Sequence, residues 1–221
     1  MLNSNQKNQS QVIKQKPLSE IIAEELRKRI WNREFDFGQR LIESDLALQM
    51  DISRSSLREA FQILEHEKLV INKSRKGTFL NNFTENDMEE ITEVRLMLEV
   101  PALIQAAENL RPEDSKYLEN LLDLMKRNLD HNDWYELFNN EMEFHRYLVN
   151  LCNNSRIREI YSNLLVQIRT FFTLLKDYYV QNKESFYTEH KELLEAIQTK
   201  DKDIVEKAAQ HHIKLLLTNR L

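Results

Sequence analysis

The chain has 221 residues, of which 41% are hydrophobic and 30% are charged, as in ordinary soluble, folded proteins. No run of about 18 apolar residues occurs, so the sequence predicts no membrane-spanning helix. The single cysteine, Cys152, excludes an intrachain disulfide framework and fits a reducing cytosol. We therefore expect a cytoplasmic protein with one large domain or two small ones.

Charge and glycine are unevenly distributed along the chain. Residues 1–80 carry 14 Lys and Arg against 11 Asp and Glu, whereas residues 81–221 carry 17 against 25. A mildly basic front joined to an acidic rear indicates a nucleic-acid module attached to a part that does not contact nucleic acid. Both glycines, Gly38 and Gly77, lie in the front, so the rear is expected to consist of helices joined by short polar turns.

The first elements are expected to be an arm and two helices. Residues 1–16 are polar and rich in Asn and Gln, as in a disordered arm. A helix that ends near Asn32 should follow, with an apolar side formed by Ile21, Ile22, Leu26 and Ile30. After a turn at 36–38, a short second helix is expected to bury Leu46, Ala47 and Met50.

The segment 52–64 has the pattern of an amphipathic helix whose start suits an anion. Its apolar face is formed by Leu57, Ala60, Phe61 and Leu64. Another face and the first turn carry Arg54, Arg58, Gln62, Ser53, Ser55 and Ser56. Free backbone N–H groups, hydroxyls and two guanidinium groups together fit phosphate and the edge of guanine. We interpret this helix, 53–67, as the recognition helix of a helix-turn-helix; the alternative is an N-capped surface helix with ordinary charges.

A basic hairpin is expected after this helix. Residues 69–72 and 78–80 have strand composition and flank the turn Lys73-Ser74-Arg75-Lys76-Gly77. This order of elements is typical of a winged helix, which we assign to residues 17–82. Such a module puts its recognition helix in the major groove and its wing on the adjacent groove or phosphates. The expected DNA contacts are Ser44, Arg54, Ser55, Ser56, Arg58, Lys73, Arg75, Lys76 and Gly77.

Two motifs in this region resemble those of GntR-type bacterial transcription regulators. Residues 53–60, Ser-Arg-Ser-Ser-Leu-Arg-Glu-Ala, resemble the family's S-R-T-P-V-R-E-A-L signature, and residues 76–80 resemble its R-G-x-F-V wing. The resemblance implies a DNA-binding regulator of transcription. The chain departs from the pattern at Asp51 and Lys68, where the family usually has glycine. Because lysine tolerates left-handed backbone less well than aspartate, the end of the recognition helix stays open.

The rear of the chain, 83–221, is expected to form an all-α bundle of six helices. Thr84 should cap the first helix, and Pro101 should break or kink it. A second helix should open at Pro112, and the others are expected at 134–151, 156–180, 183–199 and 201–219. The longest should bury Ile160, Leu164, Ile168, Phe171, Phe172 and Leu175. The predicted fold class is therefore mostly α, a winged helix-turn-helix domain followed by a helical domain.

A carboxylate and several histidines in the rear have the residue types of a metal site. Glu141 and His145 are four residues apart and therefore share a helix face. With His190 and His212 they could converge from three helices and bind a transition metal. Spacing alone is weak support, because scattered, solvated histidines are the common alternative. His211 competes for the last position, but adjacent helical residues point about 100° apart and only one can face the core.

A second resemblance, over about 85–219, is to the FCD ligand-binding domain of the FadR-type branch of the GntR regulators. Residues 91–99 resemble its opening E-x-R-x-x-L-E element, and 141–145 resemble its D-x-x-x-F-H. Asn153-Asn154 resembles its S-x-N, and the Glu189-His190 and His212-Ile213 pairs match its last two histidines. The resemblance implies a divalent transition metal, zinc first with nickel or another metal as alternatives, held by Glu141, His145, His190 and His212. The family's aspartate is Glu141 here, one methylene longer, so two outcomes stay open: ligation with altered geometry, or no ligation.

Arg95 has two interpretations. It can form an i, i+4 salt bridge with Glu99, or it can clamp an organic carboxylate whose other oxygen binds the metal. The family resemblance implies the second. The expected protein is thus a homodimeric repressor that binds an inverted-repeat operator and responds to a small organic acid. The alternatives are a metal sensor and a helical metal-dependent hydrolase, but no separate general base stands out for the hydrolase.

Overall fold

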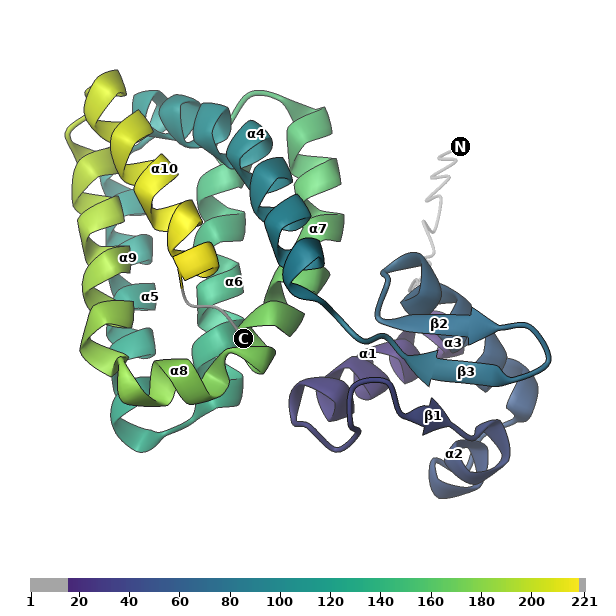
Figure 1. Cartoon of the computed structure of the whole chain (residues 1–221). Coiled ribbons are helices and arrows are strands. Elements are labelled where there is room, and N and C mark those ends of the chain that lie inside the picture. Colours follow the sequence, from purple (N-terminus) through teal and green to yellow (C-terminus); the bar gives the residue numbers. More distant parts are fainter. Residues whose placement is uncertain (1–15, 219–221) are drawn as a thin grey trace, which may run out of the picture.

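The computed structural model describes residues 16–218, so the arm expected at 1–16 lies outside the described residues except for Lys16. The front of the chain folds into three helices and a small antiparallel sheet (Figure 1). The strands lie in the order β1-β3-β2. The elements are α1 (Leu18–Trp31), β1 (Arg40–Leu41), α2 (Glu43–Gln49), α3 (Arg54–His66), β2 (Val70–Lys73) and β3 (Gly77–Leu80). The predicted winged helix is confirmed, and β1 is an addition to it.

The helix-turn-helix core is formed by the apolar faces of α1 and α3. All four residues expected on the apolar face of α3 are buried, and they pack with Leu26 and Ile30 of α1. Two predictions at the edge of this core were wrong, because Ile21 is 50% exposed and Met50 is only half-buried. The periodic pattern therefore predicted the helices correctly but assigned too many residues to their buried faces.

The rear of the chain forms seven helices within the described residues, not six (Figure 1). The helix expected at 156–180 divides at Leu175 into α7 and α8. Ile160, expected inside, is 53% exposed. The helices are α4 (Glu85–Asn109), α5 (Pro112–His131), α6 (Trp134–Asn150), α7 (Ser155–Leu174), α8 (Lys176–Gln181), α9 (Lys183–Gln198) and α10 (Lys202–Thr218).

Pro101 lies inside α4, which continues to Asn109, so of the two outcomes expected at this residue, a break or a kink, the break does not occur. A proline removes one helical hydrogen bond and crowds the preceding turn. The segment after it is nevertheless held in place, since Ala102, Leu103 and Ala106 are completely buried. Packing of α4 against α10, α6 and α7 thus outweighs the local cost of the proline. Among the described helices, none combines the length and the apolar character that crossing a bilayer requires.

Candidate functional site

The start of α3 presents the expected basic and hydroxyl side chains to solvent. Arg54, Ser55 and Arg58 are exposed. Ser53 is the N-cap, and its Oγ accepts a hydrogen bond from the backbone N–H of Ser56 at 3.1 Å. The same Oγ lies 2.9 Å from the Oγ atoms of Ser55 and Ser56. Ser53 therefore orders the turn that was expected to meet phosphate, a role that its N-cap position indicates.

Arg58 has a protein partner that the sequence did not predict. Its Nε donates to Oε2 of Glu43, the first residue of α2, at 2.8 Å. The Arg58 side chain nevertheless remains 63% exposed. The contact ties the two helices of the motif together and holds the guanidinium on the outer face of α3. Ser44, also expected to contact DNA, is exposed and bonds to Asp45 Oδ1 at 3.0 Å.

The wing forms the tight turn between β2 and β3. Lys73, Arg75 and Lys76 are exposed, and Gly77 has a φ of 96°, which favours glycine. A side chain at this position would also approach the Arg40 guanidinium, whose Nε and Nη2 lie 3.4 Å from a Cβ built on Gly77. Arg40 is exposed on β1. It adds a cation beside the wing that sequence reasoning missed, because the two-residue strand β1 was not foreseen.

The four candidate metal ligands, from three helices of the bundle, meet in its core. One ligand atom from each of the four residues lies within 4.8 Å of those of the other three, and all four residues are buried. His145 Nε2 lies 3.2 Å from Glu141 Oε1 and 3.1 Å from His212 Nε2, and His190 Nε2 contacts Glu141 Oε2. We call this group the Glu141 cluster; it consists of Glu141 and His145 from α6, His190 from α9 and His212 from α10.

The outer nitrogens of two histidines face acceptor atoms of the surrounding protein. His190 Nδ1 lies 2.7 Å from the backbone carbonyl of Phe186, to which it donates when protonated, so that Nε2 faces the cluster. His145 Nδ1 lies 3.2 Å from Glu99 Oε2, and Glu99 is paired with Arg95. Such contacts orient metal-binding histidines and raise their basicity.

Polar atoms of the cluster are poorly satisfied by protein alone. Both carboxylate oxygens of Glu141, Nδ1 of His145, Nε2 of His190 and Nδ1 of His212 make no hydrogen bond of acceptable geometry to any described residue. Buried polar atoms without partners are costly. Three imidazoles and a carboxylate form a donor set suited to a divalent transition metal, so these residues fit such an ion.

The charge states in the cluster follow from its burial. Burial alone raises the pKa of Glu141, but His190 and His145 hold it well below its usual value. Burial and the neighbouring imidazoles lower the pKa of His212 well below its usual value. Burial also lowers the pKa of His145, but Glu141 and Glu99 outweigh it and raise this pKa to about 9. Two of the ligands are thus in their metal-binding form, whereas His145 must release a proton to bind a cation.

Arg95 forms the salt bridge with Glu99 that was one of its two interpretations, and the contact with an effector carboxylate stays a prediction. It is 2% exposed and faces the bundle interior, where its Nε and Nη2 contact both carboxylate oxygens of Glu99. Tyr161, which the sequence analysis did not identify, is buried on α7, and its hydroxyl has no hydrogen-bond partner within residues 16–218.

His66, His131 and His211 are exposed and lie outside the Glu141 cluster. His212 is therefore the inward-facing member of the adjacent pair.

Comparisons with known proteins agree with both halves of this description. The family model for bacterial regulatory proteins of the gntR family matches residues 18–80, and the FCD domain model matches residues 90–215. The gluconate operon transcriptional repressor of Bacillus licheniformis is 32% identical over 192 residues, which cover 85% of this chain and 78% of the relative. The transcriptional repressor NanR of Citrobacter rodentium is 26% identical over 219 residues, covering 90% and 83%.

Two solved structures have the same architecture. A GntR transcriptional regulator from Rhodococcus sp. RHA1 has a TM-score of 0.77 and 25% identity, covering 90% of this chain and 95% of its own. McbR/YncC of E. coli has a TM-score of 0.75 at 21% identity, with coverages of 90% and 94%, a likeness that shows the fold alone.

Proposed function

We propose that this chain is a repressor controlled by a small organic acid held at a metal centre. The premise is that the chain belongs to the gntR family of bacterial regulatory proteins and carries their FCD domain. The family and the relatives are transcriptional regulators, which leaves the hydrolase alternative without support. The observation that carries the proposal is the buried Glu141 cluster, in which four potential ligands lie close together in the domain that follows the DNA-binding module.

The DNA-binding part of the proposal rests on the exposed face of α3 and on the wing. Residues 17–82 bind DNA, and we call them the reading module. Residues 83–221 bind the effector, and we call them the regulatory module. Both act in the cytoplasm, where the operator lies. Arg54 and Arg58 reach base edges or phosphates in the major groove, the serines contact the backbone, and the wing meets the adjacent phosphates. On DNA, Arg58 exchanges its contact with Glu43 for one with the operator.

Replacement of Arg58 tests this assignment. Arg58→Ala should weaken operator binding by roughly 1–3 kcal/mol, the usual loss for a base contact. The measurement is a titration at fixed salt, because phosphate contacts make affinity strongly salt-dependent. Arg156→Ala, which removes an exposed arginine from the start of α7, is the matched control. Equal affinities for the two variants would remove Arg58 from the DNA interface.

The metal part of the proposal rests on the unsatisfied donor atoms of the Glu141 cluster. A divalent ion there, zinc or nickel before others, supplies a positive charge and an open coordination position to an effector carboxylate. The purified chain should hold about one metal ion per chain, the ratio expected for one site with four protein donors. Combined replacement of His190 and His212 by alanine should abolish it. His211→Ala, which changes the exposed neighbour of His212, should leave the metal content unchanged.

The effector part of the proposal takes its first probe from a relative. The gluconate operon repressor points to a hydroxylated carboxylic acid, which combines a metal-binding carboxylate with further hydrogen-bonding groups. Arg95, buried beside the cluster, would exchange part of its contact with Glu99 for the effector carboxylate. Gluconate should raise the melting temperature of the metal-loaded chain and weaken operator binding, whereas uncharged glucitol should do neither. An operator affinity that follows the metal alone would instead favour a metal sensor.

The proposed active form is a homodimer on an inverted repeat. Exposed apolar side chains lie on α4 and α7, two helices that pack against each other. They include Met97 at 71% exposure, Ile160 at 53% and Val94 at 39%. A two-fold interface formed by these helices would bury these side chains and present two reading modules to two half-sites.

A further inference from the structure

A buried arginine without an acidic partner lies between the DNA-binding module and the bundle. Arg169, on α7, is 2% exposed, and within residues 16–218 no carboxylate bonds to it. Its Nη1 donates to Thr173 Oγ1 at 2.7 Å and its Nη2 to the Tyr135 carbonyl at 3.3 Å, while Nε has no hydrogen-bond partner there. Burial lowers the pKa of Arg169 to about 9, so the side chain stays charged at neutral pH. A buried charge needs compensation from its surroundings.

Aromatic rings from both parts of the chain supply that compensation. Cζ of Arg169 lies 4.9 Å from the ring centre of Trp31, 5.0 Å from that of Phe138 and 5.6 Å from that of Tyr135. A desolvated cation near aromatic faces is attracted by their negative charge density. Trp31 is the last residue of α1, whereas Tyr135 and Phe138 belong to α6. One guanidinium therefore contacts the reading module and the regulatory bundle together.

Hydrogen bonds fix the end of α1 at the same place. Trp31 Nε1 donates to Thr170 Oγ1 at 3.2 Å. Arg33 Nη2 donates to the backbone carbonyls of Thr173 and Leu174, at 2.7 and 3.0 Å, which occupies acceptors that the end of α7 leaves free. We call this contact the Arg169 latch; it consists of Trp31, Arg33, Tyr135, Phe138, Arg169, Thr170 and Thr173.

A continuous set of packed rings leads from the Glu141 cluster to the Arg169 latch. The His190 ring lies 4.6 Å from that of Phe186, whose carbonyl also faces His190 Nδ1. The Phe186 and Phe138 ring centres are 6.4 Å apart, and Phe138 contacts Arg169. Phe138 also precedes Glu141 by one turn of α6. The cluster and the latch therefore share both a helix and an aromatic core.

We propose that Arg169 is the positioning residue that couples occupancy of the Glu141 cluster to the orientation of α1, and through α1 to the recognition helix. The inference rests on the proposed function and names the physical link which that function requires. A ligand that draws α6 and α9 together moves Phe138 and Phe186. The guanidinium, which contacts Phe138 and Trp31 together, passes this movement to α1, which packs directly on α3.

Two replacements of Arg169 separate this role from simple packing. Arg169→Met keeps a long, flexible side chain and loses the charge, whereas Arg169→Lys keeps the charge and loses the planar fork. If the residue only fills space among aromatic rings, Met should serve at least as well as Lys, because an uncharged side chain needs no compensation. If the cation couples the two parts, Lys should retain part of the response and Met should lose it.

The experiment compares operator affinity for metal-stripped and zinc-loaded full-length chain, with and without gluconate. Wild type should change by about tenfold between states, within the usual range of coupling. Arg169→Met should bind zinc normally and show no change, and Arg169→Lys an intermediate one. A Met variant that binds zinc and responds like wild type overturns the inference alone. A wild type that takes up zinc without any response to zinc or gluconate overturns the proposed regulation, and the inference with it.

Fluorescence of Trp31 gives a second readout that does not depend on DNA. The chain has two tryptophans, so Trp134→Phe leaves Trp31 as the only one. Zinc should shift its emission when Arg169 is present and leave it unchanged in the Met variant. If the Met variant does not fold, Trp31→Phe tests the link from the other side, since it keeps a ring and removes the bond to Thr170; it should reduce the operator response. An emission indifferent to zinc while operator affinity responds overturns the inference.

Discussion

At the scale of single residues, the backbone at two positions where the family usually has glycine adopts a conformation that favours glycine. Asp51 has a φ of 51° and Lys68 a φ of 65°. The sequence left the end of the recognition helix open because lysine stands at that position. The structure resolves the question, since α3 ends at His66 and Lys68 follows in the left-handed conformation, with its N–H bonded to the Glu65 carbonyl at 3.0 Å. The turn after α3 therefore forms although lysine occupies its left-handed position.

Lys68→Gly should stabilise the chain. The left-handed region costs an L-residue roughly 1–2 kcal/mol, and the extra freedom of glycine in the unfolded state cancels about 0.4–1 kcal/mol of the relief. The net gain in the free energy of unfolding should be roughly 0.5–1 kcal/mol, measured by urea denaturation. Lys116→Gly, at an exposed position inside α5, is the control and should lose about 1 kcal/mol. A loss for both variants would mean that Lys68 is not strained.

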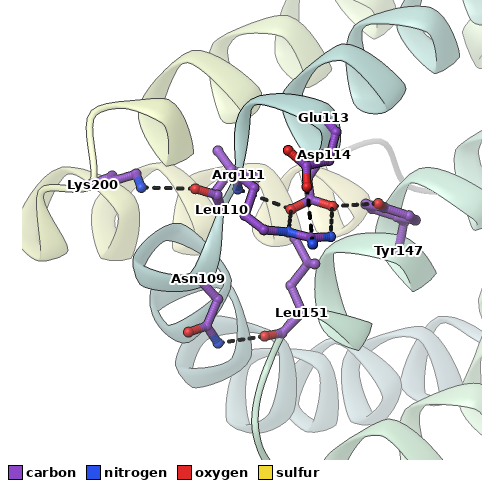
Figure 2. Close-up of polar contacts among 8 residues, drawn as sticks. All are labelled: Asn109, Leu110, Arg111, Glu113, Asp114, Tyr147, Leu151 and Lys200. Carbon is purple, nitrogen blue, oxygen red and sulfur yellow. Dashed lines mark hydrogen bonds and ion pairs between the residues drawn. The ribbon is translucent and has the colours of Figure 1, made fainter.

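Asp114 is one of the buried carboxyl groups that should make stability depend on pH in the acid range. Its carboxylate is completely buried and accepts hydrogen bonds from Arg111 and, at 2.7 Å, from the Tyr147 hydroxyl (Figure 2). The bonds from Arg111 and Tyr147 lower its pKa to about 2 against the opposing effect of burial. Because the folded pKa lies below the unfolded one, the stabilisation is complete above about pH 4 and disappears as pH falls towards 2.

Asp114→Asn should therefore lower the free energy of unfolding at pH 7 by roughly 1.5–3 kcal/mol, the range for hydrogen bonds to a charged group. The difference from wild type should shrink as pH falls below about 4. Unfolding measured at a series of pH values checks both statements. Asp123→Asn, at an exposed position of the same helix, should show neither effect. A pH-independent loss in the Asp114 variant would indicate a packing defect instead of lost charge.

At the scale of elements, periodicity and caps predicted most of the helices, and packing decided the remainder. The helical face of α3 and the Thr84 cap of α4 were evident from spacing and residue type. The continuation of α4 through Pro101 and the division at Leu175 were not, because both depend on contacts between distant segments. Thr173 and Leu174 carbonyls at the end of α7 are bonded by Arg33, about 140 residues earlier. No local pattern contains that information.

The candidate site was predictable in composition but not in its surroundings. Histidines four residues from a carboxylate or beside apolar residues suggested the cluster, and family resemblance selected its members. The sequence did not predict that the Phe186 carbonyl orients His190, or that Arg169 is buried among aromatic rings without a carboxylate partner. Arginine is normally assumed to be exposed or paired, and only the assembled bundle shows the three rings around it.

The start of α4 offers a test at the same scale. Thr84 Oγ1 accepts from the Asp87 N–H at 3.2 Å, and the Asp87 carboxylate accepts from the Thr84 N–H at 2.7 Å, a reciprocal capping box. Thr84→Ala should lower the free energy of unfolding by about 1 kcal/mol and speed hydrogen exchange in the first turn of α4. Ser74→Ala in the exposed wing turn should change neither quantity. Unaltered exchange in the Thr84 variant would show that bundle packing alone holds this turn.

At the scale of the whole molecule, the exposed apolar side chains of α4 and α7 are the proposed contact site for a second copy of the chain. Met97 and Val94 lie three residues apart and so share a face of α4, while Ile160 lies on the adjoining α7. Met97→Glu places a charge in the proposed two-fold interface, where it meets its own symmetry mate. We expect a monomer in sedimentation experiments. Affinity for a full inverted repeat should fall about a hundredfold, since two linked modules gain affinity through effective concentration.

Binding to a single half-site should be unchanged in the Met97 variant, because α3 is untouched. Val180→Glu, which charges a 42% exposed apolar residue on α8, serves as the control and should remain a dimer with full operator affinity. If the Met97 variant stays dimeric, the copies meet elsewhere on the surface. If it becomes monomeric and still binds the full repeat as wild type does, each chain reads DNA alone. Regulation then acts within one chain, in which the Arg169 latch joins the two parts.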